Sequence, residues 1–292
     1  MEFDKIMKKK RGFSIALAMI FVVLTLSLTA CNGWFSNNPD PTRYYIDIGK
    51  VDDARTASIV ANNTIASCVR IISEYKTVTS ASSGFVITED GYVLTNRHCV
   101  VRYSSTGNDT PMFGSDKPMS ANYSVVFADN KEYSASLVAF SSSADLAVLK
   151  INTLNIPLIS NDAKFQALVF ETERELYYGE RVYTIGNPEN IGLILTELTI
   201  ASPAIRLNKN DMHDTVILDG NINHGNSGGP LFNAYSRICG IVYARIDGSS
   251  KDAYGIGCAI STDVIIDFLD SIKNADINYK TTPAATSSGE AA

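Results

Sequence analysis

Short apolar runs separated by turn-forming residues dominate the chain between residues 68 and 260. The runs are rich in β-branched and aromatic residues, which favour strands, and they fall into two sets of six. The first set predicts strands at residues 68–72, 84–88, 92–95, 123–128, 133–140 and 146–151. The second set predicts strands at residues 181–185, 193–200, 215–218, 230–232, 239–244 and 254–260.

Helical periodicity is limited to two segments, residues 52–65 and 263–272. The turn formers Asp90, Gly91 and Asn130 lie between neighbouring predicted strands, so these strands should pair antiparallel. We therefore expect an all-β fold of two small six-stranded antiparallel barrels with few short helices. The barrels should cover about residues 55–155 and 165–265, followed by a C-terminal helix.

The parts of the chain outside this pattern are polar or low in sequence complexity. Residues 102–122 form a long polar stretch that we expect to be a surface insertion near the first barrel. The end of the chain, residues 279–292, is rich in Thr, Ser, Ala and Gly and is predicted to be a disordered tail. The folded domain should therefore cover residues 52–278.

The N-terminus carries a basic cluster, Lys8 to Arg11, followed by an apolar stretch at 13–30. This pattern indicates a secretion signal, although 18 residues are also just enough for an uncleaved membrane anchor. Leu28-Thr29-Ala30-Cys31 resembles a bacterial lipobox, in which cleavage exposes a cysteine that is then lipidated. We therefore expect residues 1–30 to be a lipoprotein signal peptide. Residues 31–51 would then be a tether, with a lipid on Cys31 anchoring an extracytoplasmic protein to a bacterial membrane.

Composition and charge exclude several function classes. With 45% hydrophobic and 19% charged residues, the chain is not a disordered protein. The formal net charge is −6, and no Lys- or Arg-rich run occurs beyond the N-terminus, so nucleic acid is not an expected partner. The three histidines and the scattered cysteines match no metal-ligand spacing, and we expect neither a metal nor another cofactor.

Four cysteines remain besides Cys31, namely Cys68, Cys99, Cys239 and Cys258. In an oxidising compartment they could form disulfides in three possible pairings. They could equally be free thiols buried as small hydrophobic side chains. The spacing does not decide between these alternatives.

The most informative segment for chemistry is Gly225-Asn226-Ser227-Gly228-Gly229-Pro230. Glycines on both sides of a serine allow a tight turn, and the N–H groups of Gly225 and Ser227 could converge into an oxyanion hole. A serine nucleophile needs a base, and His98 follows a predicted strand in the first half of the chain. Asp145 opens the apolar run at 146–151 and could orient that base.

Each of these features has a common structural interpretation: a hairpin turn, a surface histidine or a turn-capping aspartate. Together they resemble a trypsin-fold serine protease of the HtrA/Deg type, over roughly residues 55–275. The resemblance consists of ordered blocks, at residues 83–98, 145–151, 179–188, 225–230, and the pair 240–244 with 255–260. It implies that Ser227 is the nucleophile, His98 the general base and Asp145 its orienting partner. It also implies that Gly225 and Ser227 supply the oxyanion donors and that polypeptides are the substrates.

The chain departs from related proteases at several positions. Asn226 replaces the aspartate with which digestive trypsin-like enzymes bind a newly cut N-terminus, so that route of activation is not expected. No acid occurs at the expected pocket floor, and we predict small or medium aliphatic P1 residues. The pocket residues implied by the resemblance are Asn221, Val242, Tyr243, Ala244 and Ile256.

HtrA proteins usually continue into PDZ domains, which bind peptides by adding a strand to a sheet edge. Only about 20 residues follow Ile272, so we expect no PDZ-mediated peptide binding. The oligomeric state stays open. The main alternative function is a catalytically silent trypsin-fold lipoprotein that acts as a binding module. A substrate-binding lipoprotein of a transport system is disfavoured because such proteins are typically α/β, whereas this chain is rich in strands.

Overall fold

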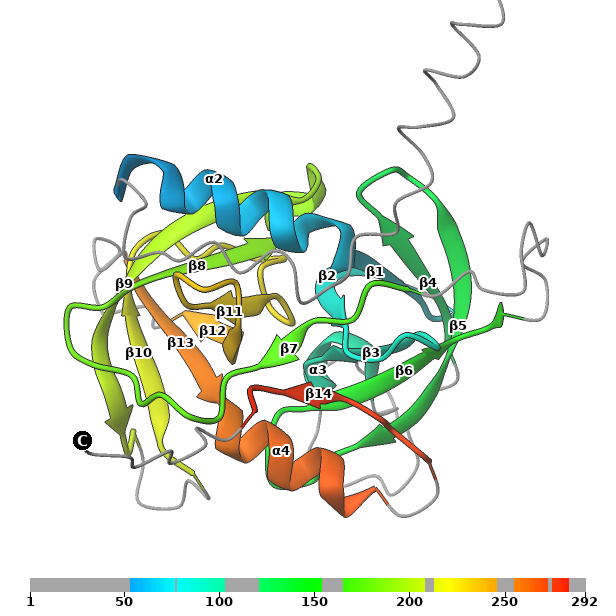
Figure 1. The fold of residues 1–292 in the computed structure, drawn as a ribbon. Coiled ribbons are helices and arrows are strands. Elements are labelled where there is room, and N and C mark those ends of the chain that lie inside the picture. The colour runs from blue at the N-terminus through cyan, green and yellow to red at the C-terminus, as the bar shows by residue number, and fades with distance from the viewer. Residues whose placement is uncertain are drawn as a thin grey trace, which may run out of the picture. The chain divides into compact units, whose positions relative to one another are not determined.

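The first set of strands closes into an antiparallel barrel in the order β1, β2, β3, β6, β5, β4 (Figure 1). The computed structural model describes residues 53–76, 78–102, 121–153, 165–207, 213–245, 255–272 and 275–283. The strands are β1 (Cys68–Glu74), β2 (Thr79–Val86), β3 (Tyr92–Thr95), β4 (Asn122–Phe127), β5 (Glu132–Phe140) and β6 (Ala147–Ile151). All six overlap the strands predicted from the apolar runs.

The second set also forms a closed antiparallel arrangement, in the order β11, β8, β9, β10, β13, β12, completed by pairing of β11 with β12. Its strands are β8 (Arg181–Gly186), β9 (Ile194–Ile205), β10 (Thr215–Asp219), β11 (Pro230–Phe232), β12 (Ile238–Arg245) and β13 (Ile256–Ser261). The predicted double-barrel fold is therefore confirmed.

Two short strands were not predicted. β7 (Val169–Phe170) pairs in parallel with β12, and β14 (Lys280–Thr281) pairs in parallel with β7. The prediction of a disordered tail from residue 279 is wrong at its start, because residues 279–283 are tied to the folded domain. The Tyr279 hydroxyl bonds to the Asp270 carboxylate (2.6 Å), and Lys280 pairs with Glu89 of the first barrel (2.6 Å).

Buried apolar side chains form three clusters. One fills the first barrel and includes Ile71, Val93 and Leu149, and another fills the second barrel and includes Leu198 and Leu218. The third draws on both barrels and contains Phe85, Leu94, Tyr183, Ile185 and Phe232. This shared cluster fixes the first barrel against the second.

The helical elements are α2 (Asp53–Thr64), η2 (Ile65–Ser67), α3 (Arg97–Val100), η4 (Pro188–Asn190) and α4 (Thr262–Ser271). α2 and α4 confirm the two segments of helical periodicity. Among the described residues, no helix is both long enough and apolar enough to span a membrane. The predicted signal peptide, the lipidation site Cys31 and residues 103–120 of the predicted insertion lie outside the described residues.

Candidate active site

The register of the first barrel explains why His98 and Asp145 meet. Strands β3 and β6 are antiparallel, with Thr95 opposite Ala147. His98 lies three residues after Thr95, on the short helix α3, and Asp145 lies two residues before Ala147. Two residues that are distant in sequence therefore emerge at the same end of a strand pair.

The Asp145 carboxylate receives two hydrogen bonds from His98. The ring Nδ1 lies 2.5 Å from Oδ2, and the backbone N–H of His98 donates to Oδ1 (2.9 Å). The buried side chain of Asn96 donates to the backbone carbonyl of Asp145 (2.8 Å), which holds the aspartate from a second direction. Because Nδ1 carries the proton that is donated to Asp145, Nε2 of the neutral ring has a free lone pair that can accept a proton.

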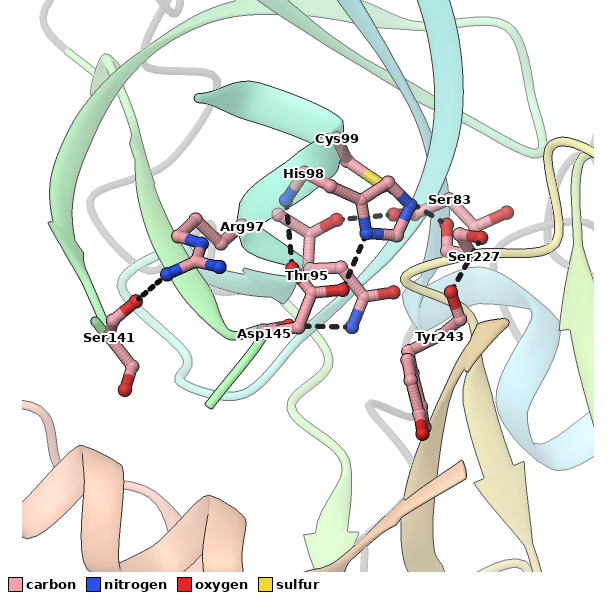
Figure 2. Close-up of polar contacts among 10 residues, drawn as sticks. Ser83, Thr95, Arg97, His98, Cys99, Ser141, Asp145, Ser227 and Tyr243 are labelled. Atoms are coloured by element: carbon pink, nitrogen blue, oxygen red, sulfur yellow. Dashed lines mark hydrogen bonds and ion pairs between the residues drawn. The ribbon is translucent and has the colours of Figure 1, made fainter. Parts of the chain in front are cut away.

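The side chain of His98 is 49% exposed on its outer side, and Figure 2 shows its ring between Asp145 and Ser227. Burial lowers the pKa of His98, but its interaction with Cys99 and its hydrogen bond to Asp145 outweigh this effect. The Asp145 charge acts in the same direction, so the pKa of His98 is raised above its ordinary value. The imidazolium form of this histidine is therefore stabilised in the folded protein.

Cys99 contributes a contact that the sequence analysis did not anticipate. Its Sγ lies 3.6 Å from Nε2 of His98 and 3.6 Å from the backbone carbonyl oxygen of Ser227. The thiol therefore lies beside the ring nitrogen that faces the second barrel. It also bridges the base to the serine turn.

Ser227 lies in the turn between β10 and β11, and the glycines nearest to it on either side have left-handed backbone conformations. Gly225 has φ +95° and Gly228 has φ +85°. A Cβ at Gly225 would lie 2.2 Å from the carbonyl oxygen of Asn187, and one at Gly228 would lie 2.1 Å from that of Ser83. Both positions therefore require glycine for conformation and for space.

The hydroxyl of Ser227 donates to the backbone carbonyl of Tyr243 (3.2 Å), a contact visible in Figure 2. A hydroxyl has one proton, so the Ser227–His98 hydrogen bond that activates a nucleophile is not the one formed here. Such bonds are often long or absent in ligand-free sites and tighten when substrate binds. Rotation of the Ser227 side chain would be needed to form it.

The carbonyl groups of residues 224–227, around the serine, are all bound. Glu189 N–H donates to the His224 carbonyl (2.8 Å), Ser83 Oγ donates to that of Gly225 (2.6 Å), and Gly229 N–H donates to that of Asn226 (2.9 Å). The Ser227 carbonyl accepts from the backbone N–H of Ser83 (2.9 Å). In a trans peptide the N–H points opposite the C=O, so the Gly225 N–H is directed away from Glu189. Such a turn can present N–H donors to an anionic oxygen.

The residues predicted to form a specificity pocket lie in different environments. Asn221 and Ile256 are exposed, and Tyr243 and Ala244 are half-buried. Val242 is fully buried in the core of the second barrel. Ile222, which was not predicted from the sequence, is buried. If Gly257 carried a Cβ, that atom would lie 2.6 Å from the Ile222 side chain. Ile222 therefore packs against the strand that carries Ile256.

The four cysteines of the described domain are free and buried, namely Cys68, Cys99, Cys239 and Cys258. This decides between the alternatives that the spacing left open. Burial raises the pKa of the Cys68, Cys239 and Cys258 thiols, so these three stay protonated near neutral pH.

Comparison with known proteins matches residues 82–241 to the model of the family described as "Trypsin-like peptidase domain". A "Probable periplasmic serine endoprotease DegP-like" from Rhizobium meliloti (strain 1021) is 32% identical over 190 residues, 65% of this chain and 32% of that protein. A protein of the same name from Hahella chejuensis is 30% identical over 198 residues, 67% of this chain and 36% of its own length. The chain spans about a third of the length of these curated relatives.

Solved structures are similar as well. The HtrA-type protease AlgW with tripeptide aligns with a TM-score of 0.58 and 28% identity, covering 74% of this chain and 63% of that chain. The Rv3671c protease from M. tuberculosis in its active form aligns with a TM-score of 0.58 and 25% identity, covering 83% of this chain and 94% of that chain.

Proposed function

The chain belongs to the trypsin-like peptidase family, as an HtrA-type domain, and from this premise we propose that it is a serine endopeptidase with Ser227, His98 and Asp145 as its catalytic triad. The observation that carries the proposal is the paired contact of His98 with Asp145 beside a turn in which the carbonyls of residues 224–227 are bound. A base with a fixed tautomer and a pre-formed turn are two costly requirements of acyl transfer.

In the proposed reaction, Ser227 Oγ attacks the carbonyl carbon of the scissile peptide bond while Nε2 of His98 takes its proton. The Gly225 and Ser227 N–H groups stabilise the negative charge on the carbonyl oxygen. Nε2 then protonates the leaving amine, and an acyl-enzyme remains on Ser227. Water, deprotonated by His98, hydrolyses this ester and restores the free serine. Throughout, Asp145 keeps Nδ1 protonated and stabilises the imidazolium.

The proposed location is outside the cytoplasm, which the periplasmic relatives support. Attachment through a lipid on Cys31 is proposed from the lipobox resemblance alone. Polypeptides of the envelope or cell surface are the proposed substrates. Small or medium aliphatic P1 residues are the proposed preference, because the residues around the expected pocket, including Ile222 and Ile256, are mainly apolar.

The test is digestion of an unfolded polypeptide, reduced and carboxymethylated casein, by the full chain. We expect peptides whose new C-termini are enriched in Ala, Val and Ile, and no digestion by the Ser227→Ala variant. Equal digestion by the variant would show a contaminating protease. Absence of digestion by folded wild-type protein would favour a binding role for the same fold.

A further inference from the structure

The turn that carries Ser227 is held by contacts from other segments as well as by its own residues. Gly225 lies between the peptide groups that carry the two proposed oxyanion donors, and glycine occupies positive and negative φ with similar ease. Rotation of the neighbouring peptides would turn a carbonyl toward the site in place of an N–H. Within the turn, the N–H of Asn226 donates to the Asn223 carbonyl (3.1 Å), whereas the Gly225 carbonyl of the same peptide is bound from outside the turn.

Ser83 makes those contacts from the first barrel. It lies on β2, is fully buried, and forms hydrogen bonds through its side chain and both backbone groups. Its Oγ accepts from the backbone N–H of Asn187 (2.8 Å) and donates to the Gly225 carbonyl (2.6 Å). Because Asn187 occupies the acceptor side, the single hydroxyl proton is directed at Gly225.

The backbone of Ser83 extends this connection. Its N–H donates to the Ser227 carbonyl (2.9 Å), and its own carbonyl accepts from the Thr95 hydroxyl (2.7 Å). Thr95 ends β3, the strand that leads to His98. One residue therefore links the strand before the proposed base to the carbonyl of Gly225 and to the carbonyl of Ser227 itself.

The peptide that Ser83 Oγ binds lies between the N–H groups of Gly225 and Ser227 in the chain. Its orientation sets how these two donors are directed relative to one another. The preceding peptide is bound independently by Glu189, whose N–H contacts the His224 carbonyl. Glu189 itself has φ +50°, a conformation that a non-glycine residue adopts only at a cost.

We propose that Ser83 is a positioning residue that fixes the Gly225–Asn226 peptide and thereby aligns the oxyanion donors of the catalytic turn. This inference rests on the proposed protease function and assigns Ser83 no contact with substrate. It predicts a loss confined to transition-state stabilisation, because the donors act on charge that develops during the reaction.

The experiment compares Ser83→Ala with Ser82→Ala in the full chain. Ser82 is the neighbouring residue on β2 and is also buried, and its hydroxyl has no hydrogen-bond partner among the described residues. Hydrolysis of peptide p-nitroanilides with Ala or Val at P1 gives kcat and KM. The inhibition constant of the matching peptide boronic acid reports transition-state affinity, and the pH profile reports His98.

For Ser83→Ala we expect kcat to fall about 30-fold and KM to change less than about twofold. This loss of kcat is smaller than the loss expected when an oxyanion donor is removed entirely, because the donors are misaligned but still present. Boronic acid affinity should fall by a similar factor, and the pH midpoint should stay in place. Ser82→Ala should match wild type. If Ser83→Ala does not fold, Ser83→Cys, which keeps a weaker donor, should show the same pattern with a smaller loss.

Two results would overturn the inference, and they are distinguishable. The first result is an active wild type together with a folded Ser83→Ala variant whose kcat is unchanged or whose only change is a higher KM. This result would exclude the positioning role of Ser83 and leave the proposed function intact. Folded wild type as inert as Ser227→Ala would overturn the proposed function and this inference together.

Discussion

The first barrel holds His98 and Asp145 through the register of two adjacent strands, whereas the second barrel holds Ser227 through a glycine turn that other segments bind. Thr95 and Ala147 are paired residues, and the site residues follow from that pairing. Ser227 depends instead on Ser83 of the opposite barrel and on Glu189. The proposed base and its orienting partner are therefore positioned by local strand pairing, while the turn of the proposed nucleophile is positioned by the junction of the barrels.

The largest expected effect tests the locally set half. In Asp145→Asn, the amide can present a donor to Nδ1 and favour the wrong ring tautomer, so kcat should fall about 10⁴-fold with the fold retained. Steady-state hydrolysis and circular dichroism provide the measurement. Asp129→Asn is the control, because Asp129 pairs with Lys131 on the exposed β4–β5 turn. A loss below about tenfold for Asp145→Asn would contradict the assigned role.

The next effect tests the turn. In Gly225→Ala the new Cβ would lie 2.2 Å from the Asn187 carbonyl oxygen, so the turn must shift, and kcat should fall about 100-fold. Gly179→Ala is a matched control, since Gly179 has φ +79° with nothing within 4 Å of its Cβ position. The control should lose about 1 kcal/mol of unfolding free energy and no activity. Equal activity loss in both variants would mean that backbone strain alone is responsible.

A smaller effect concerns pH. Only neutral His98 can act as base, and its pKa is raised, so kcat/KM should increase with pH through a midpoint above 6.5. By linkage, the stability contributed by the His98–Asp145 pair is complete below 6.5 and is lost as pH rises through the folded-state pKa. Cys99→Ala removes one group that raises this pKa, so the midpoint should move to lower pH. Cys239→Ala, in the second barrel core, should leave it in place.

The smallest expected effect is that of a reductant on thermal stability, where we expect no change. Because Cys68, Cys99, Cys239 and Cys258 are free, dithiothreitol should leave the thermal midpoint of the folded domain unchanged. Differential scanning calorimetry with and without the reductant is the measurement. A decrease of several degrees would show that a disulfide stabilises one of the barrels.

The sequence predicted the strands well because each is a short apolar run bounded by turn residues, a pattern that needs no tertiary information. It could not predict β7 and β14, which are only two residues long and carry no period. The assignment of Val242 to the pocket stays a prediction, and its side chain is buried. A β-bulge between Val242 and Ala244 alters the alternation of inward and outward side chains there.

The proposed site shows the same division. His98, Asp145 and Ser227 were found because a serine nucleophile restricts its partners to a few residue types. Ser83 was not singled out, because its contact with Gly225 joins positions 142 apart in sequence and depends on how the barrels pack. A polar residue beside the apolar run of β2 was the only sequence signal, and Ser80 and Ser82 carry the same signal.

A fluorophosphonate probe reacts with an activated serine, so it tests whether Ser227 is a nucleophile activated by His98. Wild type, Ser227→Ala and His98→Ala are labelled in parallel after circular dichroism shows that each is folded. We expect labelling of wild type and no labelling of either variant. Absence of labelling in folded wild type, or labelling that persists in Ser227→Ala, would contradict this expectation.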